Sequence, residues 1–249
     1  MQPKLSVITV VYNNVRDIER TVLSVLNQSY PLIEYIVIDG GSTDGTVAIL
    51  EKYKDKISVL ISESDKGIYD AMNKGLAKAT GDYVLFMNSG DEIYAQETIE
   101  DVFDTEHAAD IYYGETEMFN DKWQSLGQRR HCAPENFNWR SFKYGMSVGH
   151  QAIFIKRSIT APYDLKYKYS SDIDWIIKAA KKASSIVNTH MYVAKYLVGG
   201  MSKKKHLASL QERFEIFTKY YGLIPNLINH VFIALSLFAY FVKNRRTND

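Results

Sequence analysis

Acidic and amide side chains follow the apolar runs in the first part of the sequence, and they are the residues best suited to chemistry. Asp39 follows one such run, Asp65 follows another, and the segment 88–91 follows a third. Carboxylates accept hydrogen bonds from the N–H groups of a base and from ribose hydroxyls, and they bind cations that bridge phosphates. These residues predict a site for a nucleotide diphosphate with a metal ion. The sequence contains neither the G-x-G-x-x-G pattern of dinucleotide sites nor a Walker A motif.

The segment 88–91 also has a simpler interpretation. Asn-Ser-Gly-Asp is favourable turn chemistry, and Asp91 could cap a helix that begins near Glu92. The apolar run before it, Tyr83–Met87, indicates a strand buried on both faces in the middle of a parallel sheet. A carboxylate at the end of such a strand lies where open α/β sheets bind ligands.

The elements that must position these residues alternate between strand and helix. Runs rich in β-branched and aromatic residues predict strands over 5–11, 35–38, 57–61 and 83–87. Apolar residues at helical spacing predict the intervening helices, over 15–26, 47–53 and 68–76. Right-handed crossovers convert this order into a parallel sheet with helices on its faces. The polar strand ends are therefore predicted to converge at one edge of the sheet.

Length, charge and cysteine content narrow the class of protein. A chain of 249 residues can form one large domain, or one domain with an appendage, and a net charge of +1 provides no general attraction for nucleic acid. The single cysteine, Cys132, excludes an internal disulfide, and the apolar run near the N-terminus is too short for a signal peptide. The histidines show no structural zinc spacing. We therefore expect a cytoplasmic protein without a nucleic-acid partner.

Three motifs closely resemble those of family 2 glycosyltransferases. They are the runs Ser6–Asn14 (SVITVVYNN), Val37–Thr46 (VIDGGSTDGT) and Ser64–Gly75 (SDKGIYDAMNKG). The resemblance covers about residues 4–200, and the most similar subgroup acts in bacterial exopolysaccharide, capsule or O-antigen assembly. It implies the GT-A fold, an α/β nucleotide-sugar-binding fold with a mostly parallel central sheet. It also implies an inverting, metal-dependent transfer from a UDP-sugar to a glycan or a lipid-linked saccharide.

The resemblance also assigns the residues that bind the donor nucleotide. Asp39 matches the carboxylate that contacts the uracil or ribose, and Asp65 matches the carboxylate beside the base. The strand residues Thr9 and Tyr12 match positions that line the nucleotide pocket. The full set is Thr9, Tyr12, Asp39, Asp65, Lys66, Gly67 and Asn88.

The family's metal motif, Asp-x-Asp, is reduced in this sequence to Asn88-Ser89-Gly90-Asp91. Asp91 is the carboxylate that remains, and Asn88 offers a neutral oxygen. The resemblance implies that Asp91 binds Mg²⁺ or Mn²⁺, and the change in the motif leaves the identity of the metal open. One carboxylate together with diphosphate oxygens and waters is sufficient to hold either ion.

Asp172 matches the acidic residue that precedes a short aromatic-containing helix in the family and serves as general base. Inverting transfer needs such a base to remove the proton of the acceptor hydroxyl. Asp174 and His150 are the alternative candidates. Because a helix dipole favours acids in the first turn, Asp172 and Asp174 could also have a purely structural role.

The acceptor side is less well defined by the sequence. In the family, the irregular region 117–147 faces the acceptor, and aromatic and basic side chains suit sugars and phosphates. The same side chains could equally belong to a packed surface loop: Trp123, Arg129, Arg130, His131, Trp139 and Arg140.

We expect a glycosyltransferase domain over residues 1–202 and a helical extension over 203–249. The basic run Lys203–Lys205 could close over the diphosphate or form an exposed face. The last apolar stretch, over 231–242, is shorter than the roughly 20 residues that span a bilayer, and basic residues follow it. It predicts a helix on the inner surface of the cell membrane, or one that packs on the domain or in a homodimer.

Two other functions are compatible with parts of the sequence. Sugar-1-phosphate nucleotidyltransferases share the α/β architecture, but they usually have a Gly-rich basic first loop, which the segment Tyr12–Arg16 lacks. A nucleotide-sugar-binding protein without catalysis would be consistent with the reduced metal motif.

Overall fold

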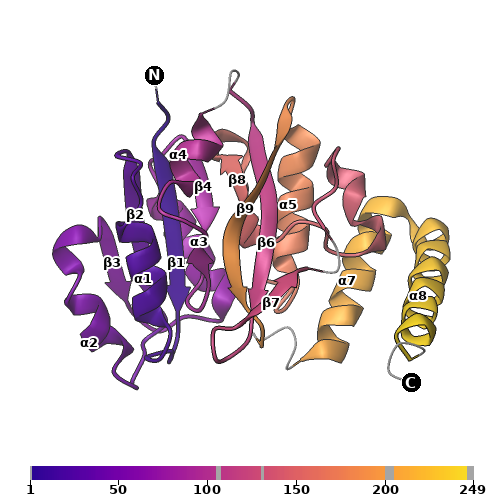
Figure 1. Ribbon diagram of the computed structural model, residues 1–249, viewed down its shortest axis with the longest axis horizontal. Coiled ribbons are helices and arrows are strands. Elements are labelled where there is room, and N and C mark those ends of the chain that lie inside the picture. Colours follow the sequence, from indigo (N-terminus) through magenta and orange to yellow (C-terminus); the bar gives the residue numbers. More distant parts are fainter. Residues whose placement is uncertain (1, 105–107, 130–131, 200–204, 246–249) are drawn as a thin grey trace.

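One nine-stranded sheet runs through the molecule in the order β3-β2-β1-β4-β8-β6-β9-β5, with β7 paired to β6 (Figure 1). The computed structural model describes residues 2–104, 108–129, 132–199 and 205–245. Helices cover both faces of the sheet, which gives the α/β architecture that the sequence predicts.

The first half of the sheet is parallel. Its strands are β1 (Leu5–Val11), β2 (Ile33–Asp39), β3 (Val59–Ser62) and β4 (Tyr83–Phe86). The connecting helices are α1 (Ile18–Leu26), α2 (Thr46–Glu51) and α3 (Ile68–Lys78). In register, Val11 pairs with Asp39 and Asp39 pairs with Ser62, so these strands end side by side.

Strand β1 is buried on both faces because its side chains alternate between two cores. Ile8 and Val10 belong to the core beneath α3, whereas Val7 and Val11 belong to the core beneath α1. Each of these side chains is at most 5% exposed. This burial explains why the sequence of the strand is an unbroken apolar and β-branched run.

The second half of the sheet is mixed. Strand β8 (Ile153–Lys156) is antiparallel to β4 and to β6 (Ile111–Phe119), and β6 is parallel to β9 (Ile186–Leu197). Two short strands, β5 (Glu92–Ile93) and β7 (Ser125–Gln128), pair antiparallel with β9 and β6. Helix α4 (Thr98–Phe103) follows β5. Because Glu92 begins a strand, the alternative that Asp91 caps a helix is wrong.

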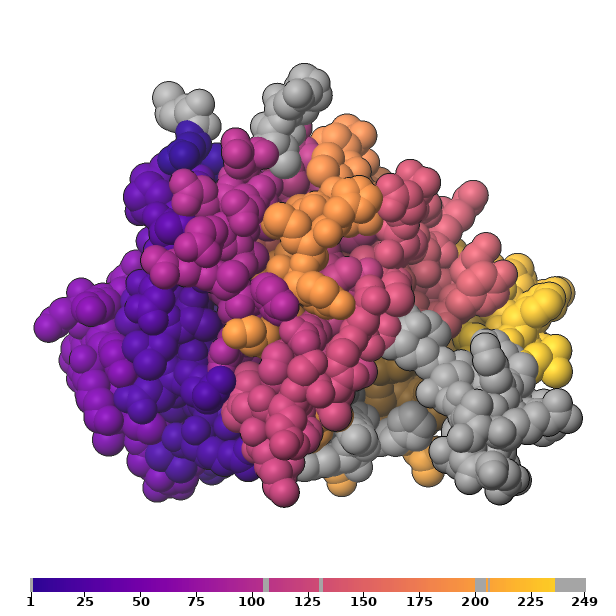
Figure 2. All heavy atoms as spheres, viewed as in Figure 1, coloured from indigo at the N-terminus to yellow at the C-terminus, as the bar shows by residue number. Residues whose placement is uncertain are grey.

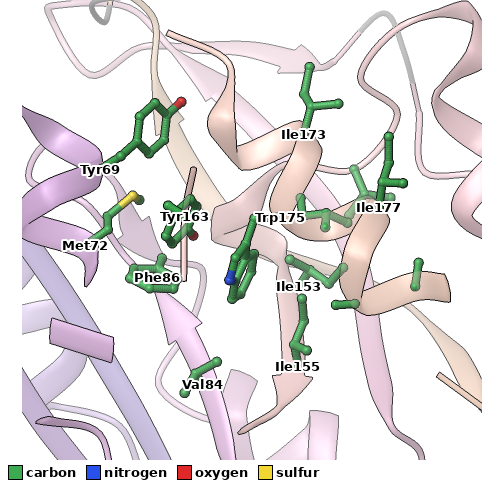
Figure 3. Packing of buried hydrophobic residues seen from close by; sticks show 14 of the residues in the cluster. Tyr69, Met72, Val84, Phe86, Ile153, Ile155, Tyr163, Ile173, Trp175 and Ile177 are labelled. Atoms are coloured by element: carbon green, nitrogen blue, oxygen red, sulfur yellow. The ribbon is translucent and has the colours of Figure 1, made fainter. Parts of the chain in front are cut away.

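Helix α5 (Ser171–Lys182) is held against the sheet by a stack of aromatic rings. The ring of Tyr163 lies 4.9 Å from that of Trp175 on α5 and 5.4 Å from that of Tyr69 on α3, as centroid distances (Figure 3). Phe86, at the end of β4, meets both Tyr163 and Trp175 edge-on. The stack therefore links the end of β4 to the first turns of two helices.

Four short 3-10 helices lie in the connections: η1 (Lys54–Lys56), η2 (Trp139–Tyr144), η3 (His150–Ala152) and η4 (Arg157–Ile159). The chain ends in helices α7 (His206–Tyr221) and α8 (Leu223–Arg245). Ile216 and Phe217 of α7 are buried in the same core as α5. Helix α8 packs on α7 at the end of the molecule opposite the N-terminal strands (Figure 2). Among the described helices, none is long and apolar enough to cross a membrane.

Candidate active site

Asp39 ends β2 with a carboxylate that is only partly satisfied. Its Oδ2 accepts hydrogen bonds from the backbone N–H groups of Gly41 (3.1 Å) and Ser42 (3.0 Å) and from Ser62 Oγ (2.7 Å). Its Oδ1 is buried and has no partner within the described part of the chain. A buried acceptor without a donor is unusual in proteins, so this atom is suited to a donor group supplied by a ligand.

Gly40 brings Asp65 and Tyr12 together. A Cβ atom at position 40 would lie 2.3 Å from Asp65 Oδ2 and 3.4 Å from Tyr12 Cδ2, so a side chain there would displace the Asp65 carboxylate. The Tyr12 side chain is 65% exposed, which leaves it accessible to a planar base. Asp65 Oδ1 accepts a hydrogen bond from the N–H of Gly67 (2.7 Å), and Gly67 has a φ of +119° that favours glycine.

Lys66 and Gly67 lie in the turn beside Asp65, and both are exposed. The Lys66 backbone N–H donates a hydrogen bond to Asp70 Oδ2 at 3.0 Å. The backbone of this turn is therefore fixed by two carboxylates, while the Lys66 side chain is accessible to solvent.

Thr9 does not fit its predicted role. Its side chain is fully buried, and its hydroxyl donates to the Met87 carbonyl (2.7 Å) and hydrogen-bonds Tyr35 Oη (3.0 Å). The reason is that both faces of β1 are covered, so only residues beyond the end of the strand reach solvent. Thr9 links β1 to β4 and does not line a nucleotide site in this structure.

A continuous chain of hydrogen bonds joins Asn88 to Asp172. Asn88, which follows β4, lies with its Nδ2 2.9 Å from His150 Nε2, and His150 Nδ1 lies 3.3 Å from Asp172 Oδ2. Tyr69 Oη donates to Asp172 Oδ1 at 3.2 Å. His150 Nδ1 faces the carboxylate and can donate a proton to it, whereas Nε2 faces the Asn88 amide. Asp172 is thus joined to three other segments, directly through Tyr69 and His150 and indirectly through Asn88.

The environment of Asp172 keeps it ionised. Burial alone would raise the pKa of Asp172, but the hydrogen bond and charge of His150, with the charge of Arg213, hold that pKa below its usual value. The side chain retains 13% exposure. An ionised carboxylate that is partly accessible can accept a proton from a hydroxyl group.

Asp91 lies beside the same chain of hydrogen bonds, in a more apolar position. It is 6% exposed, and burial raises its pKa to about 7 despite the charges of His150 and Arg129. Its Oδ1 accepts one hydrogen bond, from the N–H of Leu197 at 3.3 Å. Asn88 Oδ1 is also buried without a partner among the described residues.

A carboxylate oxygen of Asp91 and the amide oxygen of Asn88 are compatible with binding of a divalent cation. Phosphate oxygens of the substrate would complete the coordination of that cation. The described residues contain no cluster of three or more His, Cys, Asp or Glu side chains that could bind a metal without substrate. Mg²⁺ is usually bound in this way, through one or two protein ligands together with phosphates and waters.

The structure contradicts Asp174 as a candidate base. Its side chain is fully buried and is paired with Lys178 Nζ (2.6 Å), Lys219 Nζ (2.8 Å) and Tyr220 Oη (2.8 Å). Residues two apart on a helix point to opposite sides, so Asp174 faces α7 while Asp172 faces His150. Asp174 fixes α5 to α7.

The residues predicted to face the acceptor lie in different surroundings. Trp139 stacks on Tyr221 at 5.8 Å, and Trp123 lies under the guanidinium of Arg20, with 3.8 Å from its Cζ to the ring centroid. Arg129 lies close enough to Asp91 and Asp172 to affect their environment. Arg130, His131, Lys203 and Lys204 lie outside the described residues.

The sequence alone does not identify Arg213 of α7 as a residue of this site, and it leaves the role of Tyr69 undecided. Tyr69 belongs to the motif at Ser64–Gly75, but helix packing explained it equally well. Arg213 lies on an amphipathic helix without a recognisable motif. No signal in the single sequence relates either residue to Asp172.

Comparisons with known proteins agree with this geometry. The family model described as Glycosyl transferase family 2 matches residues 6–161. An uncharacterized glycosyltransferase of Mycobacterium tuberculosis is 36% identical over 188 residues, which covers 72% of this chain and 69% of the relative. The putative teichuronic acid biosynthesis glycosyltransferase TuaG of Bacillus subtilis is 46% identical over 94 residues, or 36% of this chain and 37% of TuaG. The chain therefore belongs to glycosyl transferase family 2.

Solved structures share its fold. TarS 1-349 of S. aureus superposes with a TM-score of 0.66 at 23% identity, covering 91% of this chain and 71% of that chain. TarS 1-349 in complex with UDP-GlcNAc gives 0.62 at 21% identity, over 87% and 71% of the two chains. The mannosyltransferase PcManGT from Pyrobaculum calidifontis, in complex with GDP-Man and Mn²⁺, gives 0.61 at 15% identity, over 98% and 80%. The predicted GT-A-type fold is confirmed.

Proposed function

We propose that this glycosyltransferase moves a sugar, with inversion, from a UDP-sugar to a glycan or lipid-linked acceptor in cell-surface polysaccharide biosynthesis. The observation that carries the proposal is the placement of two carboxylates on one edge of the sheet. Asp39, with its unpaired Oδ1, ends β2, and Asp172 reaches the end of β4 through His150 and Asn88. Only β1 separates β2 from β4, so the ends of these two strands are roughly two strand spacings, about 10 Å, apart, and Asp172 lies beyond the end of β4. This arrangement suits a nucleoside at Asp39 and the reacting sugar near Asp172.

The donor and pathway are inferred from the relatives. TarS has been solved with UDP-GlcNAc, and TuaG is described as a teichuronic acid biosynthesis enzyme. The exposed Tyr12 ring and the Asp39 and Asp65 carboxylates offer a stacking surface and acceptors for a uridine. Family membership makes the nucleotidyltransferase alternative unfavourable, and the hydrogen-bonded Asp172 argues against a protein that only binds the donor.

Asp172 is proposed as the general base. It removes the proton from the acceptor hydroxyl as the oxygen attacks the anomeric carbon, and the UDP leaves from the opposite face of the sugar. His150 and Tyr69 hold the carboxylate through one hydrogen bond to each oxygen, so its orientation is set before substrate binds. One in-line displacement of this kind inverts the anomeric configuration.

Asp91 and Asn88 Oδ1 are proposed to hold Mg²⁺ or Mn²⁺ at the diphosphate. Such an ion, when bound, stabilises the negative charge of the departing UDP. The unpaired Asn88 oxygen and the buried Asp91 carboxylate support this assignment, since both have vacant acceptor positions and both lie near His150. Asn88 would thereby link the metal site to the base through His150.

Weaker UDP binding is expected when Asp39 or Asp65 loses its charge. Asp39→Asn and Asp65→Ala should each reduce UDP affinity by about 1–3 kcal/mol, because each removes an acceptor for the nucleoside. Isothermal titration calorimetry measures the change. Asp55→Ala removes an exposed carboxylate elsewhere and should have no effect. If both site variants bind UDP as tightly as the wild type, the nucleoside lies elsewhere.

We further propose that α8 lies on the inner surface of the cell membrane. Its described side chains include a row of large apolar residues that are each 49–71% exposed: Leu223, Ile224, Leu227, Ile228, Val231, Phe232 and Leu235. The opposite side of α8 is anchored to α7, where buried Asn226 donates to the Phe214 carbonyl (3.0 Å) and to Thr218 Oγ1 (2.9 Å). The basic residues that end the helix suit anionic lipid head groups.

Replacing Ile224, Ile228 and Val231 together with Glu should reduce binding to anionic liposomes by about tenfold or more, because three apolar side chains no longer enter the lipid. Cosedimentation measures this binding, and turnover on a short soluble acceptor should stay intact. Leu165→Glu, at a residue that is 49% exposed away from α8, is the matched control. Unchanged sedimentation, together with dissociation of a dimer in light scattering, would instead support the homodimer.

A further inference from the structure

Two guanidinium groups lie near Asp172, and among the described residues they form no direct ion pair with it or with another acid. In the part of the chain that the structure describes, neither Arg129 nor Arg213 forms an ion pair, and Arg213 Nε is buried without a hydrogen-bond partner. The adjoining segments 130–131 and 200–204 contain no Asp or Glu in their sequences. Buried or half-buried cations are normally paired, so this pair is suited to an anion that arrives with substrate.

Contacts between α7 and the loop before α5 place Arg213 beside the base. Glu212 accepts hydrogen bonds from the backbone N–H groups of Lys168 (2.7 Å) and Tyr169 (2.8 Å). One turn earlier, Ser209 Oγ lies 3.0 Å from the Oγ of Ser170, the residue that precedes α5. Arg213 is therefore held close to the first turn of α5, which contains Asp172.

Arg129 approaches the same place from the end of β7. Its Nη2 donates to the Met146 carbonyl at 3.4 Å, and its Nη1 would lie 3.1 Å from a Cβ atom at Gly149. It therefore lies against the backbone directly before His150. Burial lowers the pKa of Arg129, and the positive charge of Arg213 lowers it further.

We propose that Arg129 and Arg213 form a phosphate-binding subsite beside Asp172, and that it receives a phosphate ester of the acceptor. This inference rests on the proposed function and specifies its acceptor as a phosphate-bearing molecule. The planar guanidinium group binds phosphate oxygens in pairs, and the N-terminus of the twelve-residue helix α5 adds favourable polarity. We assign the phosphate to the acceptor because Arg213 lies near Asp172, the residue proposed to take the proton of the acceptor hydroxyl.

The test is a calorimetric titration of the full chain with glycerol 1-phosphate, in the presence of saturating UDP and Mn²⁺. Glycerol 1-phosphate should bind and glycerol should not. Arg213→Gln and Arg129→Gln should each weaken binding by about 10- to 100-fold, the usual value of a charged hydrogen bond. Arg213→Lys should fall between Gln and wild type, because it keeps the charge but loses the planar fork. Arg157→Gln, at an exposed arginine whose Nε donates to the Gly81 carbonyl, should bind as the wild type does.

Three results would overturn the subsite. The first is that glycerol 1-phosphate does not bind. The second is that the wild type and Arg213→Gln bind glycerol 1-phosphate with equal affinity. The third is that Arg213→Gln selectively loses affinity for UDP, which would assign the arginines to the donor diphosphate. Thermal melting establishes that each variant is folded. If the wild type fails to bind UDP, the proposed donor is wrong, and the same titration without UDP still decides the arginine assignment.

Discussion

Replacing Asp172 with Asn should lower turnover by about 10²–10⁴-fold and leave UDP-sugar binding near normal. The amide has the shape of the carboxylate and keeps one acceptor oxygen, for Tyr69 or for His150, but it cannot accept the proton of the acceptor hydroxyl. The rate of UDP release at saturating donor and acceptor measures the loss. Calorimetry with the UDP-sugar measures binding separately.

Asp174→Asn is the matched control for Asp172→Asn, since it removes the same charge two residues away. It should reduce turnover much less, and it should lower the melting temperature because it breaks the contacts to Lys178, Lys219 and Tyr220. A larger rate loss in Asp174→Asn than in Asp172→Asn would contradict our assignment of the base. If neither variant slows transfer, His150 becomes the next candidate.

Replacing Asp91 with Asn should lower metal-dependent turnover by at least about 10²-fold, because charge stabilisation at the leaving diphosphate is worth several kcal/mol. Turnover measured across a Mn²⁺ titration tests this expectation, and Glu97→Gln, an exposed acidic residue after β5, is the control. Wild-type activity that is insensitive to EDTA would rule out the metal role of Asp91.

The same substitution should stabilise the protein when metal and substrate are absent. Burial raises the pKa of Asp91 to about 7, whereas an unfolded chain has an ordinary Asp. Between about pH 4 and pH 7 the folded state therefore binds more protons than the unfolded state, so Asp91 makes the wild type less stable as pH rises. Asp91→Asn should remove this dependence and unfold at a higher urea concentration than the wild type at pH 8. Equal midpoints at pH 8 would contradict the raised pKa.

The arrangement of the strand ends, where we place the nucleotide, could be predicted because it depends on local patterns. Each strand of the parallel half is a short apolar run, and parallel pairing brings the ends of such runs together whatever the intervening helices contain. This pattern places Asp39, Asp65 and Asn88 at the edge of the sheet. Thr9 was misplaced because the family position, taken alone, does not say which faces of β1 are covered.

The catalytic end depends on contacts that a single sequence does not encode locally. Helical geometry could have separated Asp172 from Asp174, since residues two apart point in opposite directions. The convergence of Tyr69 and Arg213 on Asp172 could not be predicted, because these residues lie 103 and 41 positions from Asp172 in the sequence and are joined to it only by the folded core.

The position of Lys219 and Tyr220 on α7 affects the order in which the enzyme can be completed during synthesis. Strands β1 to β4 leave the ribosome first, and their parallel pairs can form among themselves. Asp174 is made later and stays without two of its partners until α7 has emerged. A nascent chain would therefore acquire the nucleotide end of its site early, and the surroundings of the base only near the close of translation.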